Sequence, residues 1–468
     1  MIAVEMIWSR GQRILGHDSF AYLEFAKQFK EHAPTRLGDW WPFGFPLAGS
    51  LVSLLTGVSA YTALFAVSAL AYWSVLYGFV LEALRSTATK STALVFTSAL
   101  ACAPICAVLL IGPMSEPLFT AALFWLAWSM ANWPKRPAIA LSVGLALVAF
   151  CIRYAGIFAF GVVALQALIR FNRIREKKSL MSFATLYVLG VAAVLGLMYT
   201  NYLFYGHATG PQPVGKESFL SWPIHFADFG WSPVEAFISG ALLKDIGGIG
   251  TWRALLLGWT STTLMLGLCV YAWKRPVSVL SRPAALLAAA YILSMVTLRA
   301  TTPFDAVSSG RTFLPVMFLL GLIAFQICSA RAPSALFVAS VLSLVLSVFL
   351  ALRGVSKETY GPISGAITPL ARLLTAESTV TVNAQAVSLA AYFPNHFVLA
   401  ADPSALPRSP GTSQFVVIAA KRTGRYGQQV GFEANWLDFT DSALKAGTAS
   451  LVERNADFII LRFAQQKK

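Results

Sequence analysis

Charge is scarce in this sequence. Only 12% of its 468 residues are Asp, Glu, Lys or Arg, whereas soluble domains usually have about 25%. Apolar residues make up 57% of the chain, and the mean hydropathy is +0.65. This composition excludes a disordered, collagen-like or disulfide-stapled protein. It predicts a chain whose surroundings are largely lipid.

Cysteines are few, and all five lie in or beside apolar runs. Cys102 and Cys106 share a predicted helix face, but no His or acidic residue is near enough in sequence to complete a metal site. We interpret the thiols as packing groups. Met1–Trp8 is too short for a signal peptide and contains Glu5. The net charge of +15 suggests nucleic acid at first, but the placement of the basic residues favours membrane topology and no nucleic-acid partner.

Ten apolar runs are candidates for transmembrane helices, because a span needs about 20 apolar residues, or somewhat fewer beside other protein. They are 61–83, 92–111, 117–132, 138–151, 154–170, 181–203, 253–273, 284–300, 312–328 and 334–352. The run at 44–56 is too short to cross and predicts an interfacial or re-entrant helix. We therefore expect a polytopic α-helical membrane protein with about ten spans.

The basic residues give an independent check on that number. Thirteen of them lie in five short connections between alternate runs, which the positive-inside rule places in the cytoplasm. Both flanks of 138–170 are basic, so the chain must cross an even number of times there. Two short helices meeting at Arg153 satisfy this condition, and a single long helix does not. Residues 1–43 and the tail from 354 are then expected outside, in the periplasm of a bacterial inner membrane.

The tail has the sequence of a soluble domain. Gly354–Thr375 predicts a linker, and helical patterns around Ala384–Phe393 and Asp441–Glu453 separate four β-like runs. These runs are Thr379–Asn383, His396–Ala400, Phe415–Ala420 and Phe458–Phe463. Alternating strands and helices predict a small α/β domain. It contains no GxGxxG, P-loop or nucleophile-elbow motif, and Gly424–Gly427 is interpreted as a turn.

The predicted organisation has three parts. Residues 1–43 form an external first loop, 44–353 the transmembrane domain, and 354–468 the periplasmic α/β domain. Within 44–352 only eight residues are acidic, which makes each of them informative. They are Glu82, Glu116, Glu176, Glu217, Asp228, Glu235, Asp245 and Asp305.

Glu116 is the most unusual of these acids, because it lies in a short turn between two apolar runs, Gly112–Pro117. A carboxylate this close to hydrocarbon is costly unless it is paired or faces a polar cavity. An acid at a helix start before Pro117 is also ordinary, since the helix dipole favours it. The sequence alone leaves both interpretations open.

A second candidate acid, Asp18, lies in the amino-terminal segment. Asp18 and Tyr22 are four residues apart and share one face of an amphipathic helix predicted to extend to about Glu31. Asp before such a run is also a normal helix cap, and spacing alone favours that interpretation. The aromatic residues of Asp39–Phe43 suit a bilayer interface.

Fixed cations complete the candidate set on the outer side. Arg153 lies in the predicted membrane hairpin, Arg311 opens the ninth span, and Lys216 lies in the loop 204–252. Arginine favours bidentate contact with phosphate, and an intramembrane arginine usually has an anionic partner. Any of these cations could instead extend to a lipid headgroup, which is the favoured role for Arg299.

The order of these motifs resembles that of the GT-C superfamily of integral-membrane glycosyltransferases, in the bacterial branch related to protein mannosyltransferases and aminoarabinose transferases. Asp18 and Tyr22 precede an element rich in aromatic residues, Gly and Pro, Phe43–Pro46. Ser115–Phe119, Arg153–Gly156, and Arg311 with Leu314-Pro315 follow it in that order. Each motif is short, and the resemblance covers roughly residues 16–330.

The resemblance implies a glycosyltransferase that moves a sugar from a polyprenyl-phosphate donor to a glycan, lipid or protein acceptor at the periplasmic face. It implies that Asp18 is the general base and that Glu116 orients acceptor or sugar hydroxyls. Arg153 and Arg311 would stabilise the leaving phosphate, as guanidinium groups suit developing negative charge. Tyr22, Lys216 and His17 complete the expected substrate-binding set.

The chain departs from relatives in two respects. Relatives usually begin with a transmembrane helix before the catalytic loop, where this sequence has only Met1–Leu15. Many also have two acids in the first loop, where this chain has one. Metal use therefore stays open, with His17 and Asp39 as alternative ligands. A lipid-linked glycan transporter or flippase, and a polysaccharide polymerase or ligase, remain the competing functions.

Overall fold

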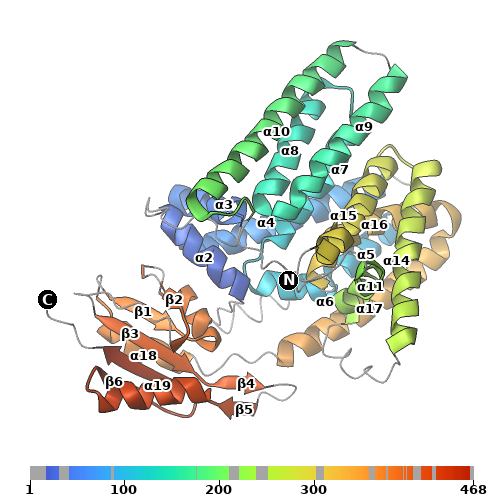
Figure 1. Cartoon of the computed structure of the whole chain (residues 1–468). Helices are drawn as coiled ribbons and strands as arrows, with labels where there is room; N and C mark the ends of the chain where they lie inside the picture. Colours follow the sequence, from blue (N-terminus) through green and yellow to red (C-terminus); the bar gives the residue numbers. More distant parts are fainter. Residues whose placement is uncertain are drawn as a thin grey trace.

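The structure is a computed structural model of the 468-residue chain (Figure 1). It describes residues 17–30, 42–85, 89–174, 177–209, 221–238, 251–301, 310–357, 364–375, 378–393, 395–396, 398–403, 413–423 and 428–463. A helical part extends to residue 357, and a mixed α/β part follows it.

Among the described residues, five helices are long and apolar enough to cross a membrane. They are α4 (Ala60–Leu84), α10 (Lys177–Tyr205), α14 (Thr251–Lys274), α15 (Ser281–Thr301) and α16 (Gly310–Arg331). The apolar window of α16 is 72% buried, whereas those of α10 and α14 are 17% buried. Helix α16 therefore lies at the centre of the bundle and α10 at its edge (Figure 1). These apolar helices make the chain a multi-pass membrane protein.

Shorter helices complete the bundle. They are α3 (Gly44–Thr56), α5 (Lys90–Ala101), α6 (Pro104–Ile111), α7 (Glu116–Ala131), α8 (Arg136–Ile152), α9 (Phe158–Ile174), α11 (Trp222–Phe229), α12 (Ser232–Ile238) and α17 (Pro333–Lys357). The run at 92–111, predicted as one span, is two helices. Ala103 has an extended backbone (φ −53°, ψ 134°), because a residue before proline disfavours the helical conformation.

The predicted break at Arg153 is present. Helix α8 ends at Ile152, Arg153 is extended (φ −148°, ψ 127°), and the 3₁₀ helix η1 (Tyr154–Ile157) leads into α9. Gly156 permits this turn, since a Cβ at that position would lie 2.4 Å from the carbonyl oxygen of Ala149. The short helix predicted at 44–56 also matches α3.

The carboxyl-terminal part is built on a five-stranded sheet with strand order β2-β1-β3-β7-β6. The strands are β1 (Thr379–Val382), β2 (Val398–Ala400), β3 (Gln414–Ala419), β6 (Ala449–Arg454) and β7 (Phe458–Phe463). β1 pairs in parallel with β2 and β3, while β7 pairs antiparallel with β3 and β6. The 3₁₀ helix η4 (Ala384–Ala391) replaces the helix predicted at Ala384–Phe393.

Two predictions for this part were wrong. Helix α19 (Ala434–Lys445) ends well before Glu453, because Gly447 adopts a left-handed conformation (φ 67°) that terminates it. β6 then begins where the helix was expected to continue. The expected linker at Gly354–Thr375 contains the end of α17 and helix α18 (Ser364–Leu373).

A small hairpin of β4 (Lys421–Thr423) and β5 (Gln428–Gly431) flanks the predicted turn, whose residues 424–427 lie outside the described ranges.

Helix α2 (His17–Lys30) lies between the two parts (Figure 1). It packs against α3 and α4 on the membrane side and against η4 on the other side. Its buried residues include Tyr22, Leu23 and Ala26. The predicted amphipathic helix is therefore a bridge with both sides covered, and the positions of Asp18 and Tyr22 depend on both contacts.

Candidate functional site

The first half of α2 is held against the turn that precedes α7. Tyr22 Oη lies 2.9 Å from Ser115 Oγ, and the Ser19 hydroxyl donates to Met114 Sδ at 3.0 Å. Burial raises the pKa of the Tyr22 hydroxyl above its ordinary value, so this group stays protonated at neutral pH. These contacts place Asp18, in the first turn of α2, beside the turn that carries Glu116.

Glu116 is the centre of a four-residue charged cluster. Arg153 Nη1 donates to Glu116 Oε1 at 2.7 Å, and Arg311 donates to the same oxygen from Nε at 2.9 Å and from Nη2 at 2.6 Å. Arg311 Nη2 also donates to Asp18 Oδ2. We call Asp18, Glu116, Arg153 and Arg311 the charged cluster. Its two carboxylates and two guanidiniums balance in charge, as burial near a membrane requires.

The members of the charged cluster differ in their access to solvent. The Glu116 side chain is 3% exposed, Asp18 16%, Arg153 19% and Arg311 33%. An incoming molecule would therefore meet Arg311, Arg153 and Asp18 before Glu116. Glu116 Oε2 is buried and accepts no hydrogen bond from any described residue. This oxygen is an unused acceptor inside an otherwise paired cluster.

The backbone around each arginine fixes its direction. Arg153 occupies the single extended residue between α8 and η1, so its side chain leaves the helix end toward α7. Arg311 lies in the first turn of α16. Tyr291 on α15 donates to the carbonyl of Thr312 at 2.9 Å, next to Arg311. The Tyr291 ring packs against Phe119 and Phe158.

The structure brings together five of the seven residues expected at the site: Asp18, Tyr22, Glu116, Arg153 and Arg311. His17 begins α2, but its side chain lies outside the described set. Lys216 and the alternative metal ligand Asp39 lie outside the described residues. Within the described ranges, no group of three or more His, Cys, Asp and Glu side chains is placed to hold a metal ion.

Two residues of the site were not singled out from the sequence as functional. Ser115 belongs to the Glu116 turn, and its hydroxyl partners Tyr22. Tyr291 lies inside the apolar run 284–300, where a hydroxyl needs a hydrogen-bond partner. Tyr291 is the one aromatic residue of this run, and its phenolic hydroxyl is the signal that would have pointed to it.

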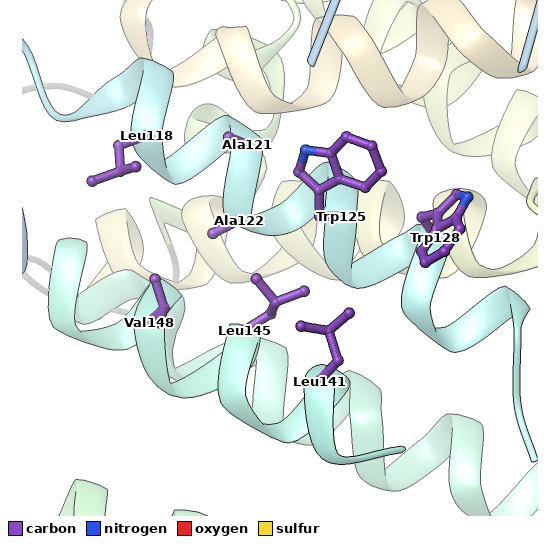
Figure 2. Close-up of a pocket in the computed structure, with 8 residues that line it drawn as sticks. All are labelled: Leu118, Ala121, Ala122, Trp125, Trp128, Leu141, Leu145 and Val148. Carbon is purple, nitrogen blue, oxygen red and sulfur yellow. The ribbon is translucent and has the colours of Figure 1, made fainter. Parts of the chain in front are cut away.

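An apolar pocket of about 360 Å³ lies between α7 and α8 (Figure 2). Its lining residues are Leu118, Ala121, Ala122, Trp125, Trp128, Leu141, Leu145 and Val148. Leu118 is two residues from Glu116, and Val148 is five residues from Arg153. The pocket therefore runs along the two helices whose ends carry members of the charged cluster.

No protein-family model matches the sequence, and no curated protein matches it. Among solved structures, the crystal structure of the aminoarabinose transferase ArnT from Cupriavidus metallidurans bound to undecaprenyl phosphate has a TM-score of 0.59. The comparison covers 96% of this chain and 94% of ArnT at 12% identity.

This chain has a GT-C fold. The resemblance expected from the sequence motifs is thus confirmed at the level of the fold, over almost the whole of both chains. The archaeal oligosaccharyltransferase AglB from Archaeoglobus fulgidus, in complex with an inhibitory peptide and a dolichol-phosphate, is more distant. Its TM-score is 0.45, at 10% identity, covering 87% of this chain and 66% of AglB.

Proposed function

We propose that this GT-C protein is a glycosyltransferase that moves a sugar from a polyprenyl-phosphate donor to an acceptor at the periplasmic face of the bacterial inner membrane. One observation carries the proposal: Asp18 of α2 meets Glu116, Arg153 and Arg311, which lie at the ends of the apolar helices α7, α8 and α16, in a single cluster. A transferase needs its general base, the second acid and the phosphate-binding groups close enough to act on the same bound substrate, and this cluster meets that requirement.

Arg311 and Arg153 would hold the phosphate of the donor. Arg311 is the more exposed of the two and uses two of its nitrogens on Glu116 and Asp18. A phosphate entering beside it would share these donors and would meet a guanidinium fixed in direction by two carboxylates. Guanidinium groups held in this way stabilise the charge that grows on the leaving phosphate without further reorganisation.

Asp18 would act as the general base. The acceptor hydroxyl oxygen forms a bond to the anomeric carbon, the bond from that carbon to the phosphate oxygen breaks, and Asp18 takes the hydroxyl proton. The polyprenyl phosphate leaves with the bonding electrons, and a single displacement inverts the anomeric centre. Asp18 suits this role better than Glu116, because its side chain is partly exposed and, among the described residues, it forms an ion pair with Arg311 alone.

Glu116 and Tyr22 would position the reacting groups. The three hydrogen bonds to Glu116 Oε1 leave Oε2 to accept a hydroxyl of the sugar or acceptor. Tyr22 fixes the direction of α2 through Ser115. Lys216 and His17 remain proposed substrate-binding residues.

The pocket between α7 and α8 would take part of the polyprenyl chain. It is lined by aliphatic and aromatic side chains (Figure 2). One of them, Leu118, is two residues from Glu116 in the sequence of α7. Polyprenyl chains are wholly apolar and gain free energy from such contact. The ArnT structure with undecaprenyl phosphate supports a carrier of this class through the shared fold.

The test is sugar transfer by purified protein with defined polyprenyl-phosphate donors. Asp18→Asn should lower turnover by about 100-fold or more, since a lost general base costs that much. Asp438→Asn, at an exposed position of α19, is the matched control and should keep the parental rate. Equal turnover of Asp18→Asn and the parent would remove Asp18 from the mechanism. Movement of intact donor across liposomes without bond cleavage would instead indicate a transporter.

A further inference from the structure

The second half of α2 carries a buried ion pair that the proposed chemistry does not use. Lys27 is 3% exposed and Glu24 is 8% exposed. Lys27 Nζ donates to Glu24 Oε1 at 2.8 Å. An i,i+3 pair on a helix usually lies in water and contributes little to stability. Burial of this pair requires partners beyond the helix itself.

Those partners come from the carboxyl-terminal part of the chain. Lys27 Nζ also lies within hydrogen-bond distance of the backbone carbonyls of Ala390 (3.2 Å), Phe393 (3.2 Å) and His396 (2.9 Å). Glu24 Oε2 accepts the backbone N–H of Val398 at 3.3 Å. The ammonium therefore has an acceptor for each of its hydrogens.

The carbonyls belong to the end of η4 and to the segment that leads into β2. The last carbonyls of a helix lack partners within it and carry partial negative charge, so a cation there is favourable. Removal of Lys27 would leave the buried carbonyls of Ala390 and Phe393 without the ammonium as donor, and backbone carbonyls have little freedom to turn toward another donor.

Asp18 lies nine residues before Lys27 on the same continuous helix, about 14 Å along its axis. Tyr22 and Ser19 fix the first half of α2 to the Glu116 turn, and Lys27 fixes the second half to the α/β part. The helix is thus held at both ends. A tilt at the Lys27 end would move Asp18 relative to Arg311.

We infer that Lys27 is a positioning residue: it ties the carboxyl-terminal α/β part to α2 and so sets the placement of Asp18 against Arg311. The expected effect of Lys27 on turnover rests on the proposed function, whereas its expected effect on the position of α2 does not. It gives the α/β part a task in the reaction that needs no substrate contact, since it supports the helix that carries the base.

Hydrogen exchange of the full-length protein tests the structural half of the inference. Lys27→Met should speed amide exchange at 390–398 and also at 17–22, which Lys27 does not touch. Lys30→Met, at the exposed end of the same helix, is the matched control and should leave both segments at the parental rate. Glu24→Gln removes one charge and keeps the carbonyl contacts, so it should give a smaller increase. Unchanged exchange at 17–22 in Lys27→Met would overturn the inference.

Turnover tests the catalytic half, with Asp18→Glu as a second background that keeps a carboxylate. In the parent, Lys27→Met should lower kcat by about tenfold with a small change in the donor KM. In Asp18→Glu the same substitution should cost less than about threefold, since changes that act through one group are not additive. Equal losses in both backgrounds would mean a general structural role and would overturn the inference. If the parent transfers no sugar, the proposed function fails, and the exchange at 17–22 alone decides whether Lys27 fixes α2.

Discussion

Asp18 and Glu116 share one hydrogen-bond donor, the Nη2 nitrogen of Arg311. The three residues come from α2, α7 and α16, which are distant in sequence. Glu116 is also paired with Arg153, whereas within the described residues Asp18 is paired with Arg311. Arg311 therefore controls both the position of the proposed base and the spacing between the two acids.

Two substitutions of Arg311 should separate the effect of its charge from the effect of its hydrogen-bond geometry. Arg311→Met leaves Asp18 without its cation and lets two carboxylates repel each other, so we expect transfer to fall by about 100-fold or more. Arg311→Lys keeps the positive charge but lacks the planar set of donors. Relative to Arg311→Met, it should restore the thermal unfolding midpoint more fully than the transfer rate. Transfer rates and thermal unfolding midpoints check both. Arg331→Met, at the far end of the same helix, is the control. A parental rate in Arg311→Met would contradict the proposed role.

The charged cluster could be predicted in part because charge is so rare in this chain. Glu116, Arg153 and Arg311 stood out in apolar surroundings, where each needs a partner. The resemblance to the GT-C superfamily predicted that Asp18, Glu116 and the two arginines meet at one site. The individual ion pairs could not be predicted, since no periodicity relates α2, α7 and α16. The same limit hid Lys27 and Glu24, which have the spacing of an ordinary surface pair. Only the packing of the α/β part against α2 shows that they are buried.

The prediction of secondary structure was wrong where local sequence signals competed with each other. Ala449–Arg454 has a helical composition, but Gly447 stops the preceding helix, and the strand gains its stability from pairing with β7. Pro104 similarly divided a hydrophobic run whose length favoured one helix. The Arg153 break was predictable because the charges on both flanks required an even number of crossings.

Gly156 offers a test of how Arg153 is held. Gly156→Ala would force a methyl group against the Ala149 backbone at 2.4 Å, which we expect to lower stability by about 1–3 kcal/mol and to weaken transfer. Gly144→Ala on the same hairpin meets nothing within 4 Å, so it should be neutral or stabilising by up to about 1 kcal/mol. Thermal unfolding of the two variants gives the comparison. Equal midpoints would show that the close approach at Gly156 does not constrain the turn.

The proposed topology, with the carboxyl-terminal part in the periplasm, makes a separate prediction. A reporter that is active only in the cytoplasm, fused after Lys468, should be inactive, and one that is active only in the periplasm should be active. The reason is the series of basic connections on the opposite side, which the positive-inside rule assigns to the cytoplasm. A control fusion in the basic connection at 170–178 should give the reverse pattern. Cytoplasmic activity of the fusion after Lys468 would overturn the proposed topology and place the charged cluster on the wrong face for this reaction.

The pocket between α7 and α8 predicts a dependence on the length of the donor chain. Leu145 is one of the pocket-lining residues (Figure 2), and Leu145→Trp would fill part of the pocket while leaving all four residues of the charged cluster in place. We expect the KM for an undecaprenyl-phosphate donor to rise about tenfold, which corresponds to about 1.4 kcal/mol. A donor with a chain too short to reach Leu145 should keep its parental KM, because its phosphate still meets Arg153 and Arg311. Leu168→Trp, at an exposed position of α9, controls for a larger side chain in the lipid-facing surface. An equal rise for long and short donors would place the prenyl chain elsewhere on the protein, since only a chain that enters the pocket can sense what fills it.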